Sequence, residues 1–236
     1  MNCDFTFKDN YDFEDLVAIV KLLRSENGCA WDREQTHKSM RKDFIEEVYE
    51  VIEAIDTEDK TLLTEELGDV LLQVVFHSRI AEENGDFDIN DVADGICKKL
   101  IHRHPHVFGD VKVKDSAEIL ENWGEIKKKE KRQTTPAKEL DDVARSLPSL
   151  MRTQKIIKRG QKANVISKDN SFALAGLVKA VSEIEKKFES PDMESLSDLL
   201  YYAAMILQNN NIDGERLLYD RCEDIISHEK EKNMCS

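Results

Sequence analysis

The sequence predicts an all-α protein. Only four prolines and nine glycines interrupt its 236 residues, and these two residue types are the strongest breakers of helices. Most of the long stretches between them carry apolar residues at the helical period. A sustained alternation of apolar and polar residues, which is typical of half-buried strands, appears nowhere in the chain. These three observations favour a fold of packed helices.

Local signals mark the ends of several of the nine helices that we expect. Asn27-Gly28 and Asn84-Gly85 follow periodic runs, and Asp169-Asn170 separates two others. Ser190-Pro191 is typical of an N-cap followed by proline at the first helical position. In chain order, the expected helices span residues 13–26, 37–56, 60–84, 90–102, 116–132, 148–160, 171–188, 192–209 and 212–230.

The helices divide into two predicted units, residues 1–132 and 133–236. Between Lys127 and Lys138 the composition changes to charged residues, threonine and proline, as expected of a connection between domains. A faint repeat links the two halves, because an acidic helix followed by an apolar helix occurs in both. Two such helix pairs are the parts of a helical bundle, and duplication would explain them.

Charge and cysteine content exclude several classes of protein. The net charge of −14 disfavours binding to nucleic acids or anionic membranes. Nucleotides fit this acidity only if a metal accompanies their phosphates. The five cysteines are scattered and odd in number, without the spacing of a zinc ribbon or a disulfide framework.

The chain carries no pattern of export or membrane insertion. Its first ten residues have neither the basic region nor the apolar core of a secretory signal. The longest strongly apolar segment, Val70 to Phe76, contains Gln73 and is too short to span a membrane. We therefore expect a cytoplasmic protein.

Two acidic motifs on neighbouring predicted helices indicate a metal site. Glu47 and Glu50 are three residues apart in the first motif, and so are Glu66 and Asp69 in the second. Residues at this spacing share one face of a helix, so an antiparallel pair would bring four carboxylates together. Such oxygen ligands suit a hard divalent cation, Mg²⁺ most simply and Mn²⁺ as an alternative.

A solvated acidic surface is the competing interpretation, because 35% of the residues are charged and acidic pairs are common on exposed helices. The carboxylates, however, border apolar stripes instead of lying opposite them. Acids at the edge of a core repel one another and lose hydration, which a bound cation relieves. The stripes consist of Phe44, Val48, Val51, Ile52 and Ile55, and of Leu63, Leu67, Val70 and Val74.

Aromatic and polar residues precede the first acidic helix in the segment from Cys29 to Met40. Trp31 offers a stacking surface for a base, and Gln35 offers hydrogen bonds. Alternatively, the segment is a capped helix start in which Trp31 packs against the protein.

Cations and aromatics follow later in the chain. Lys99 and Arg103 are four residues apart, so their charges can converge on one phosphate chain. Trp123 and Lys127 have the same spacing, although such pairs are also common as surface contacts. The three histidines at 102, 104 and 106 are a weak zinc candidate, because Pro105 lies among them.

Four motifs in order closely resemble the MazG family of all-α nucleoside triphosphate pyrophosphohydrolases, over about the first 130 residues. They are WDREQTH (31–37), EEVYEVIEAID (46–56), EELGDVLLQVVFHSRIAEE (65–83) and RHPHVFGD (103–110). The resemblance implies Mg²⁺-dependent hydrolysis of nucleoside triphosphates to monophosphates and pyrophosphate, and a homodimer whose bundles are completed between protomers.

The family's motifs also imply roles for individual residues. By resemblance, Glu47, Glu50, Glu66 and Asp69 bind the metal. Lys99, Arg103, Trp123 and Lys127 match positions expected to touch the nucleotide, and Trp31 and Gln35 stay candidates on their chemistry. Glu46 is a candidate base for the attacking water, although a solvated glutamate is equally natural there. Whether the α or β phosphorus is attacked stays open.

The second half resembles the family's C-terminal unit, for example at LPSLMRTQKIIKRGQKANV (147–165), but departs from its pattern. Lys186 and Ser195 stand where carboxylates are expected, and Ile225 stands where a cation is expected. We therefore expect a degenerate second unit. Two rival functions are a nucleotide-binding regulator without turnover and a narrow sanitation enzyme for deoxyuridine, deoxycytidine or damaged nucleotides.

Overall fold

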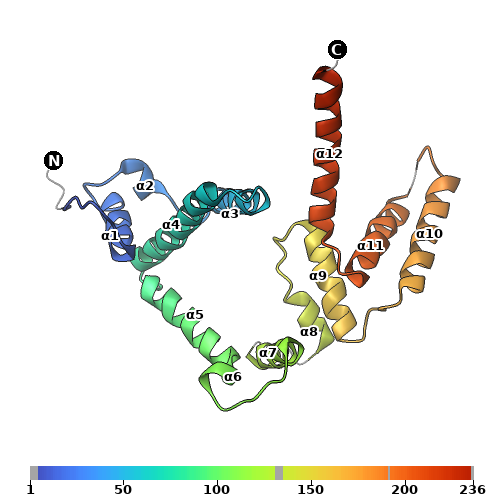
Figure 1. The fold of residues 1–236 in the computed structure, drawn as a ribbon, viewed down its shortest axis with the longest axis horizontal. Helices are drawn as coiled ribbons and strands as arrows, with labels where there is room; N and C mark the ends of the chain where they lie inside the picture. Colours follow the sequence, from blue (N-terminus) through green and yellow to red (C-terminus); the bar gives the residue numbers. More distant parts are fainter. Residues whose placement is uncertain (1–4, 131–134, 191, 235–236) are drawn as a thin grey trace. The chain divides into compact units, whose positions relative to one another are not determined.

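The structure is a computed structural model that describes residues 5–130, 135–190 and 192–234. The described residues form twelve helices and no strand, so the predicted all-α class is confirmed. The chain folds as two compact units, residues 1–116 and 117–236 (Figure 1). Among the described residues, no helix is long and apolar enough to cross a membrane.

The first unit is built around a long hairpin of two helices. Its elements are α1 (Phe13–Leu23), α2 (Ala30–Glu34), α3 (Arg41–Asp56), α4 (Lys60–Asn84), α5 (Ile89–Arg103) and α6 (Pro105–Phe108). A three-residue turn joins α3 to α4, as is usual for antiparallel helices. Asp59 caps α4, because its side chain accepts hydrogen bonds from the backbone N–H groups of Thr61 and Leu62.

The core of the first unit lies where α1 packs on the C-terminal half of α4. Its buried residues are Val20, Met40, Val75, Phe76 and Ile80. Helix α4 ends at Gly85, whose φ of +74° is left-handed and costs glycine little. The helix stop expected at Asn84-Gly85 is therefore confirmed.

The second unit contains α7 (Ser116–Glu130), α8 (Pro136–Asp141), α9 (Ser149–Lys162), α10 (Asn170–Lys186), α11 (Met193–Asn209) and α12 (Gly214–Met234). Helices α10 and α11 pack side by side, and together with α9 they form a core of Ile157, Ala173, Ala204 and Met205. The boundary that we expect between two functional domains at residue 132 stays a prediction, and residues 131–134 of the expected connection lie outside the described residues.

All nine expected helices are present, with three corrections. Residues 37–40 form a turn instead of the start of α3, because Thr36 and Ser39 exchange hydrogen bonds between side chain and backbone. Asp192 caps α11 through the N–H of Ser195, so the expected cap at Ser190 is wrong, and Pro191 lies outside the described residues. The short helices α2, α6 and α8 were not expected, since four to six residues are too few to show a helical period.

Candidate metal centre

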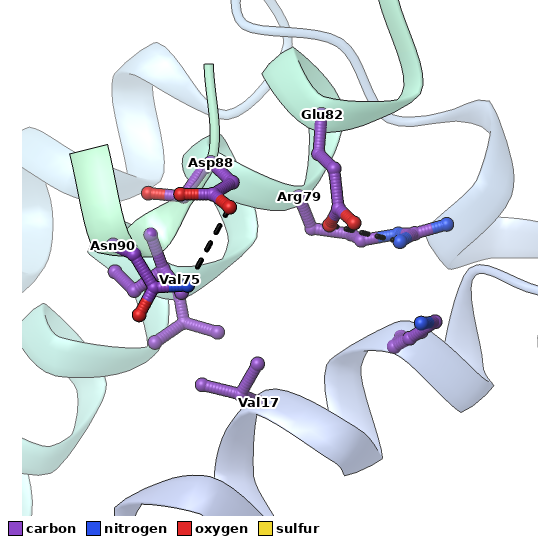
Figure 2. A pocket seen from close by; sticks show the side chains of 9 residues that line it. Val17, Val75, Arg79, Glu82, Asp88 and Asn90 are labelled. Carbon is purple, nitrogen blue, oxygen red and sulfur yellow. Dashed lines mark hydrogen bonds and ion pairs between the residues drawn. The ribbon is translucent and has the colours of Figure 1, made fainter. Parts of the chain in front are cut away.

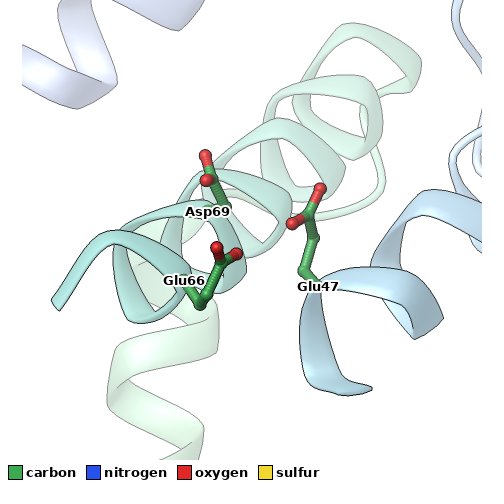
Figure 3. Close-up of side chains that lie close together, drawn as sticks. All are labelled: Glu47, Glu66 and Asp69. Carbon is green, nitrogen blue, oxygen red and sulfur yellow. The ribbon is translucent and has the colours of Figure 1, made fainter. Parts of the chain in front are cut away.

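The α3–α4 hairpin brings three carboxylates together. Glu47 comes from α3, and Glu66 and Asp69 come from consecutive turns of α4 (Figure 3). One carboxylate oxygen from each lies within 4.8 Å of the others. Because the donors are all oxygens, without histidine or cysteine among them, the group suits a hard cation such as Mg²⁺ or Mn²⁺.

Glu50 belongs to the same acidic neighbourhood. It lies one turn after Glu47 on α3, and its side chain interacts with the carboxyl groups of both Glu47 and Glu66. The structure therefore places all four predicted metal ligands on facing parts of two helices. Their role as ligands stays a proposal.

Burial and mutual repulsion disturb the protonation of this cluster. Desolvation raises the pKa of Glu47 to about 6, with further contributions from the charges of Asp69 and Glu50. The pKa of Glu66 is also raised, first by desolvation and then by Glu50 and Asp69. Glu66 is only 8% exposed. Negative charge held out of water in this way favours a bound cation.

Glu46 lies next to Glu47 but outside the cluster of carboxylates. Its side chain is 59% exposed, and one of its oxygens is 3.9 Å from Lys42 Nζ. A loose surface ion pair of this kind contributes little to stability. The role of Glu46 as the base stays a prediction.

The expected nucleotide contacts from the first motif lie on α2 and just after it. Trp31 is 58% exposed, so its ring is open to a stacking partner. The side chain of Gln35 donates to the carbonyl of Trp31 (2.9 Å) and accepts from the hydroxyl of Ser39 (2.8 Å). In the structure Gln35 therefore stabilises its own segment, and its contact with a substrate stays a prediction.

The expected phosphate-binding cations lie on α5, away from the carboxylates. Helix α5 follows the C-terminal end of α4 and leads away from it (Figure 1). Between Asp69 and Asn84, α4 alone rises by about 22 Å. Lys99 is exposed and Arg103 half-buried, near the far end of α5. The structure does not bring these cations to the carboxylates of the same chain.

Trp123 and Lys127 lie on α7, which belongs to the second unit. A 2.8 Å ion pair between Lys128 and the buried Glu139 links α7 to α8. The predicted contact of Trp123 and Lys127 with a nucleotide stays a prediction.

Sequence reasoning missed a polar network that holds residues 29–37, the segment that contains Trp31, to α4. Arg24, at the end of α1, binds the carboxylate of Glu83 and the backbone of the segment. His37 Nδ1 lies 2.8 Å from His77 Nδ1, and the two rings are stacked. The sequence did contain a signal for the burial of Arg24. Arg24 follows the buried Val20 by four residues, so it continues the same face of α1.

A small cavity of about 120 Å³ lies between α1, α4 and the start of α5 (Figure 2). Four of its polar residues bond in pairs, one of which is the Arg79–Glu82 ion pair of 2.9 Å. Asn90 donates a long hydrogen bond of 3.4 Å to the carboxylate of Asp88. The cavity is smaller than typical ligand pockets, and it lies at the end of α4 opposite the carboxylates.

The second unit has no matching group of acids among its described residues. Glu183 pairs with Lys186 at 2.6 Å, which lowers the pKa of Glu183. The hydroxyl and the backbone N–H of Ser195 both bond the side chain of Asp192 at the start of α11. Asp192 and Ser195 therefore take part in the cap of α11, and Glu183 and Lys186 form an ion pair at the surface.

The described residues thus form an all-α protein with a hairpin of converging carboxylates, and comparison with known proteins identifies the family. Residues 35–108 match the MazG nucleotide pyrophosphohydrolase domain. This region contains Glu47, Glu50, Glu66 and Asp69, as well as the two cations of α5.

Three relatives show how far the similarity extends. A nucleoside triphosphate pyrophosphohydrolase/pyrophosphatase MazG of Thermotoga maritima is 38% identical over 87% of this chain and 79% of its own length. A nucleoside triphosphate pyrophosphohydrolase of Escherichia coli is 50% identical over 61% of this chain and 55% of its own. The uncharacterized protein YabN of Bacillus subtilis is 49% identical over 63% of this chain and 30% of its own.

The chain therefore belongs to the MazG family, as its motifs predict. It spans about a third of the Bacillus relative and about half of the Escherichia relative.

Proposed function

We propose that this protein is a Mg²⁺-dependent nucleoside triphosphate pyrophosphohydrolase. It converts NTPs or dNTPs to the monophosphate and pyrophosphate, and it clears or regulates nucleotide pools in the cytoplasm. The names of the Escherichia and Thermotoga relatives support this activity. Membership of the MazG family also supports this activity.

The convergence of Glu47, Glu66 and Asp69 is the observation that carries the proposal. Three carboxylates whose oxygens lie within 4.8 Å of one another, one of them on a buried residue, repel each other unless a cation offsets their charge. The net charge of −14 would also repel a bare triphosphate. A metal at this site would remove both difficulties.

The residues of the chain then have separate tasks. Glu47, Glu50, Glu66 and Asp69 would hold the cation, and a cation there would supply positive charge to offset that of the phosphates. Lys99 and Arg103 bind phosphate oxygens, and Arg103 can do so with two parallel hydrogen bonds. Glu46 is our candidate to accept the proton of the attacking water.

We further propose that the active protein is a homodimer in which α5 of one protomer serves the carboxylates of the other. The separation of α5 from the carboxylates within one chain supports this arrangement. Large apolar side chains also remain exposed on three helices, as expected of a surface that a partner covers. They are Ile45, Val48 and Ile52 on α3, Leu67 and Leu71 on α4, and Val92, Ile96 and Leu100 on α5.

We also propose that hydrolysis comes from the first unit alone. Lys186 neutralises Glu183, and Ser195 offers only a neutral hydroxyl that already bonds Asp192. A divalent cation would find too little negative charge there.

Pyrophosphate release from a panel of NTPs and dNTPs tests the proposed function. With Mg²⁺ or Mn²⁺ we expect turnover of at least one nucleotide, with the monophosphate and pyrophosphate formed in equal amounts. Excess chelator should stop the reaction, and added Mg²⁺ should restore it. Binding of nucleotides without any turnover would instead support the rival function, a nucleotide-binding regulator.

A further inference from the structure

Arg24 is a buried cation that lies outside the proposed metal centre. Its side chain is 5% exposed. Its Nε lies 3.1 and 3.2 Å from the two carboxylate oxygens of Glu83, and its Nη2 lies 2.8 Å from one of them. The guanidinium also stands over the ring of Phe76, 5.1 Å from its centre. Helix α4 therefore fixes this side chain by charge and by packing.

The remaining nitrogen of Arg24 reaches a different part of the chain. Nη1 donates to the backbone carbonyls of Asp32 and Gln35, the latter at 3.2 Å. One guanidinium thus joins α1, α4 and the segment around α2. We call residues 29–37 the Trp31 segment.

The Trp31 segment has few other links to α4. None of the five residues of α2 is buried, so the hydrophobic effect does little to hold it in place. The start of the segment is bonded to the end of α1, where the N–H of Cys29 donates to the carbonyl of Leu23 and Arg33 donates to the carbonyl of Glu26. Its other link to α4 is the contact of His37 with His77 at its end. Trp31 itself remains 58% exposed.

We propose that Arg24 is a positioning residue that keeps the Trp31 segment on α4, so that the indole ring is held ready to stack on the base of a nucleotide. A ring that is ordered before binding loses less entropy when its partner arrives. The kinetic part of this inference rests on the proposed function, whereas the structural part does not.

The test compares Arg24→Lys with Arg79→Lys. Lysine keeps the charge, but it lacks the planar fork needed to reach the carboxylate and two carbonyls together. Arg79 is the matched control, because it binds the same Glu83 at 2.9 Å, and its side-chain bonds go to Glu82 and Glu83 of its own helix. In a Trp123→Phe background, time-resolved fluorescence anisotropy reports the motion of Trp31 alone, since the chain has two tryptophans.

Arg24→Lys should increase the local motion of Trp31, and Arg79→Lys should not. With Trp123 intact, Arg24→Lys should raise KM about tenfold if a tenth of the molecules keep the segment in place. The value of kcat should stay within about twofold, because saturating substrate selects the ordered state. Circular dichroism of the folded variant excludes general unfolding as the cause.

Wild-type anisotropy together with wild-type KM in Arg24→Lys would overturn the proposal, and so would a loss confined to kcat. If Arg24→Lys does not fold, Glu83→Gln replaces it, since loss of the carboxylate charge also loosens the guanidinium. Unchanged Trp31 motion in that variant would be equally decisive. A wild-type protein without turnover would remove the proposed function, while the anisotropy result would still decide the positioning role.

Discussion

At the scale of single residues, the carboxylates of the α3–α4 hairpin are held in a costly arrangement. Glu47 has a pKa raised to about 6 by desolvation and by its acidic neighbours, and Glu66 is buried. An ordinary solvated acidic face would not bury one carboxylate and crowd the others around it. The arrangement fits a site whose charge is completed by a cation.

Glu50→Gln should abolish pyrophosphate release while leaving the helical content unchanged. The amide keeps the volume of the side chain, but it removes one negative charge from the cluster that holds the cation. Activity and circular dichroism are measured at saturating Mg²⁺. The matched control is Glu53→Gln, an exposed glutamate on the same helix, which should remain active. Near wild-type turnover in Glu50→Gln would remove this residue from the site.

The Glu83 ion pair should make stability depend on pH. Hydrogen bonds from Arg24 and then Arg79 hold the pKa of Glu83 below its ordinary value of 4.5. The ionised form is therefore favoured by folding, so its contribution is complete above about pH 4.5 and is lost as the pH falls through the lower folded pKa. Urea unfolding should show that the free energy of unfolding of the wild type exceeds that of Glu83→Gln at pH 7, and that this difference narrows below pH 4.5. A difference in free energy of unfolding that stays constant from pH 7 to below pH 4.5 would contradict the lowered pKa of Glu83.

At the scale of elements, the long helices and the acidic hairpin follow from local patterns in the sequence. The predicted bounds of α4 agree with the structure to the residue: Asn84-Gly85 marked its end in the sequence, and the structure shows that Asp59 caps its start. The pairing of Glu47 with Glu66 and Asp69 follows from helical spacing and a short turn. The segment around α2 is not predictable in this way, since it is fixed by Arg24 and Glu83, which are 59 residues apart.

The end of α4 offers a test of backbone geometry. Gly85→Ala should destabilise the fold by about 1 kcal/mol, because its φ of +74° is unfavourable for a residue with a Cβ. Gly95→Ala, inside α5 with open space around it, should be neutral or stabilising by up to about 1 kcal/mol. Chemical denaturation measures both. A destabilised Gly95→Ala with an unaffected Gly85→Ala would show that these two backbone assignments are wrong.

At the scale of the whole molecule, the central question is how the cations of α5 would reach the carboxylates of α3 and α4 in the proposed site. Within one chain α5 leads away from α4 (Figure 1), and among the described residues apolar side chains of the same helices are exposed. The proposed second protomer would account for both observations. This relation was not visible in the spacing of residues, because it depends on the direction in which α5 leaves α4.

Mixing two defective variants tests the shared site. Glu47→Gln and Arg103→Ala should each show little or no pyrophosphate release alone, and we expect no residual activity from the second unit. Random pairing in an equal mixture makes half of the dimers heterodimers. If one protomer supplies the carboxylates and its partner supplies the cation, each heterodimer has one intact site and one defective site. Activity should then recover to about a quarter of wild type.

The control for this experiment mixes Glu47→Gln with Asp69→Asn, which damage the same set of carboxylates. Heterodimers of these two variants contain no intact set, so their activity should not recover. Failure of the first mixture to recover, with exchange of protomers shown by light scattering or crosslinking, would place the carboxylates and the cation of one site in the same chain.

The most direct test of the central claim is Mn²⁺ binding, followed by electron paramagnetic resonance, in wild type and in Asp69→Asn. Mn²⁺ serves as the spectroscopic substitute for Mg²⁺ at an oxygen-rich site. We predict saturable binding to the wild type, and an affinity lower by at least about tenfold in Asp69→Asn. Equal affinity in the two proteins would contradict a metal centre built from the carboxylates of α3 and α4.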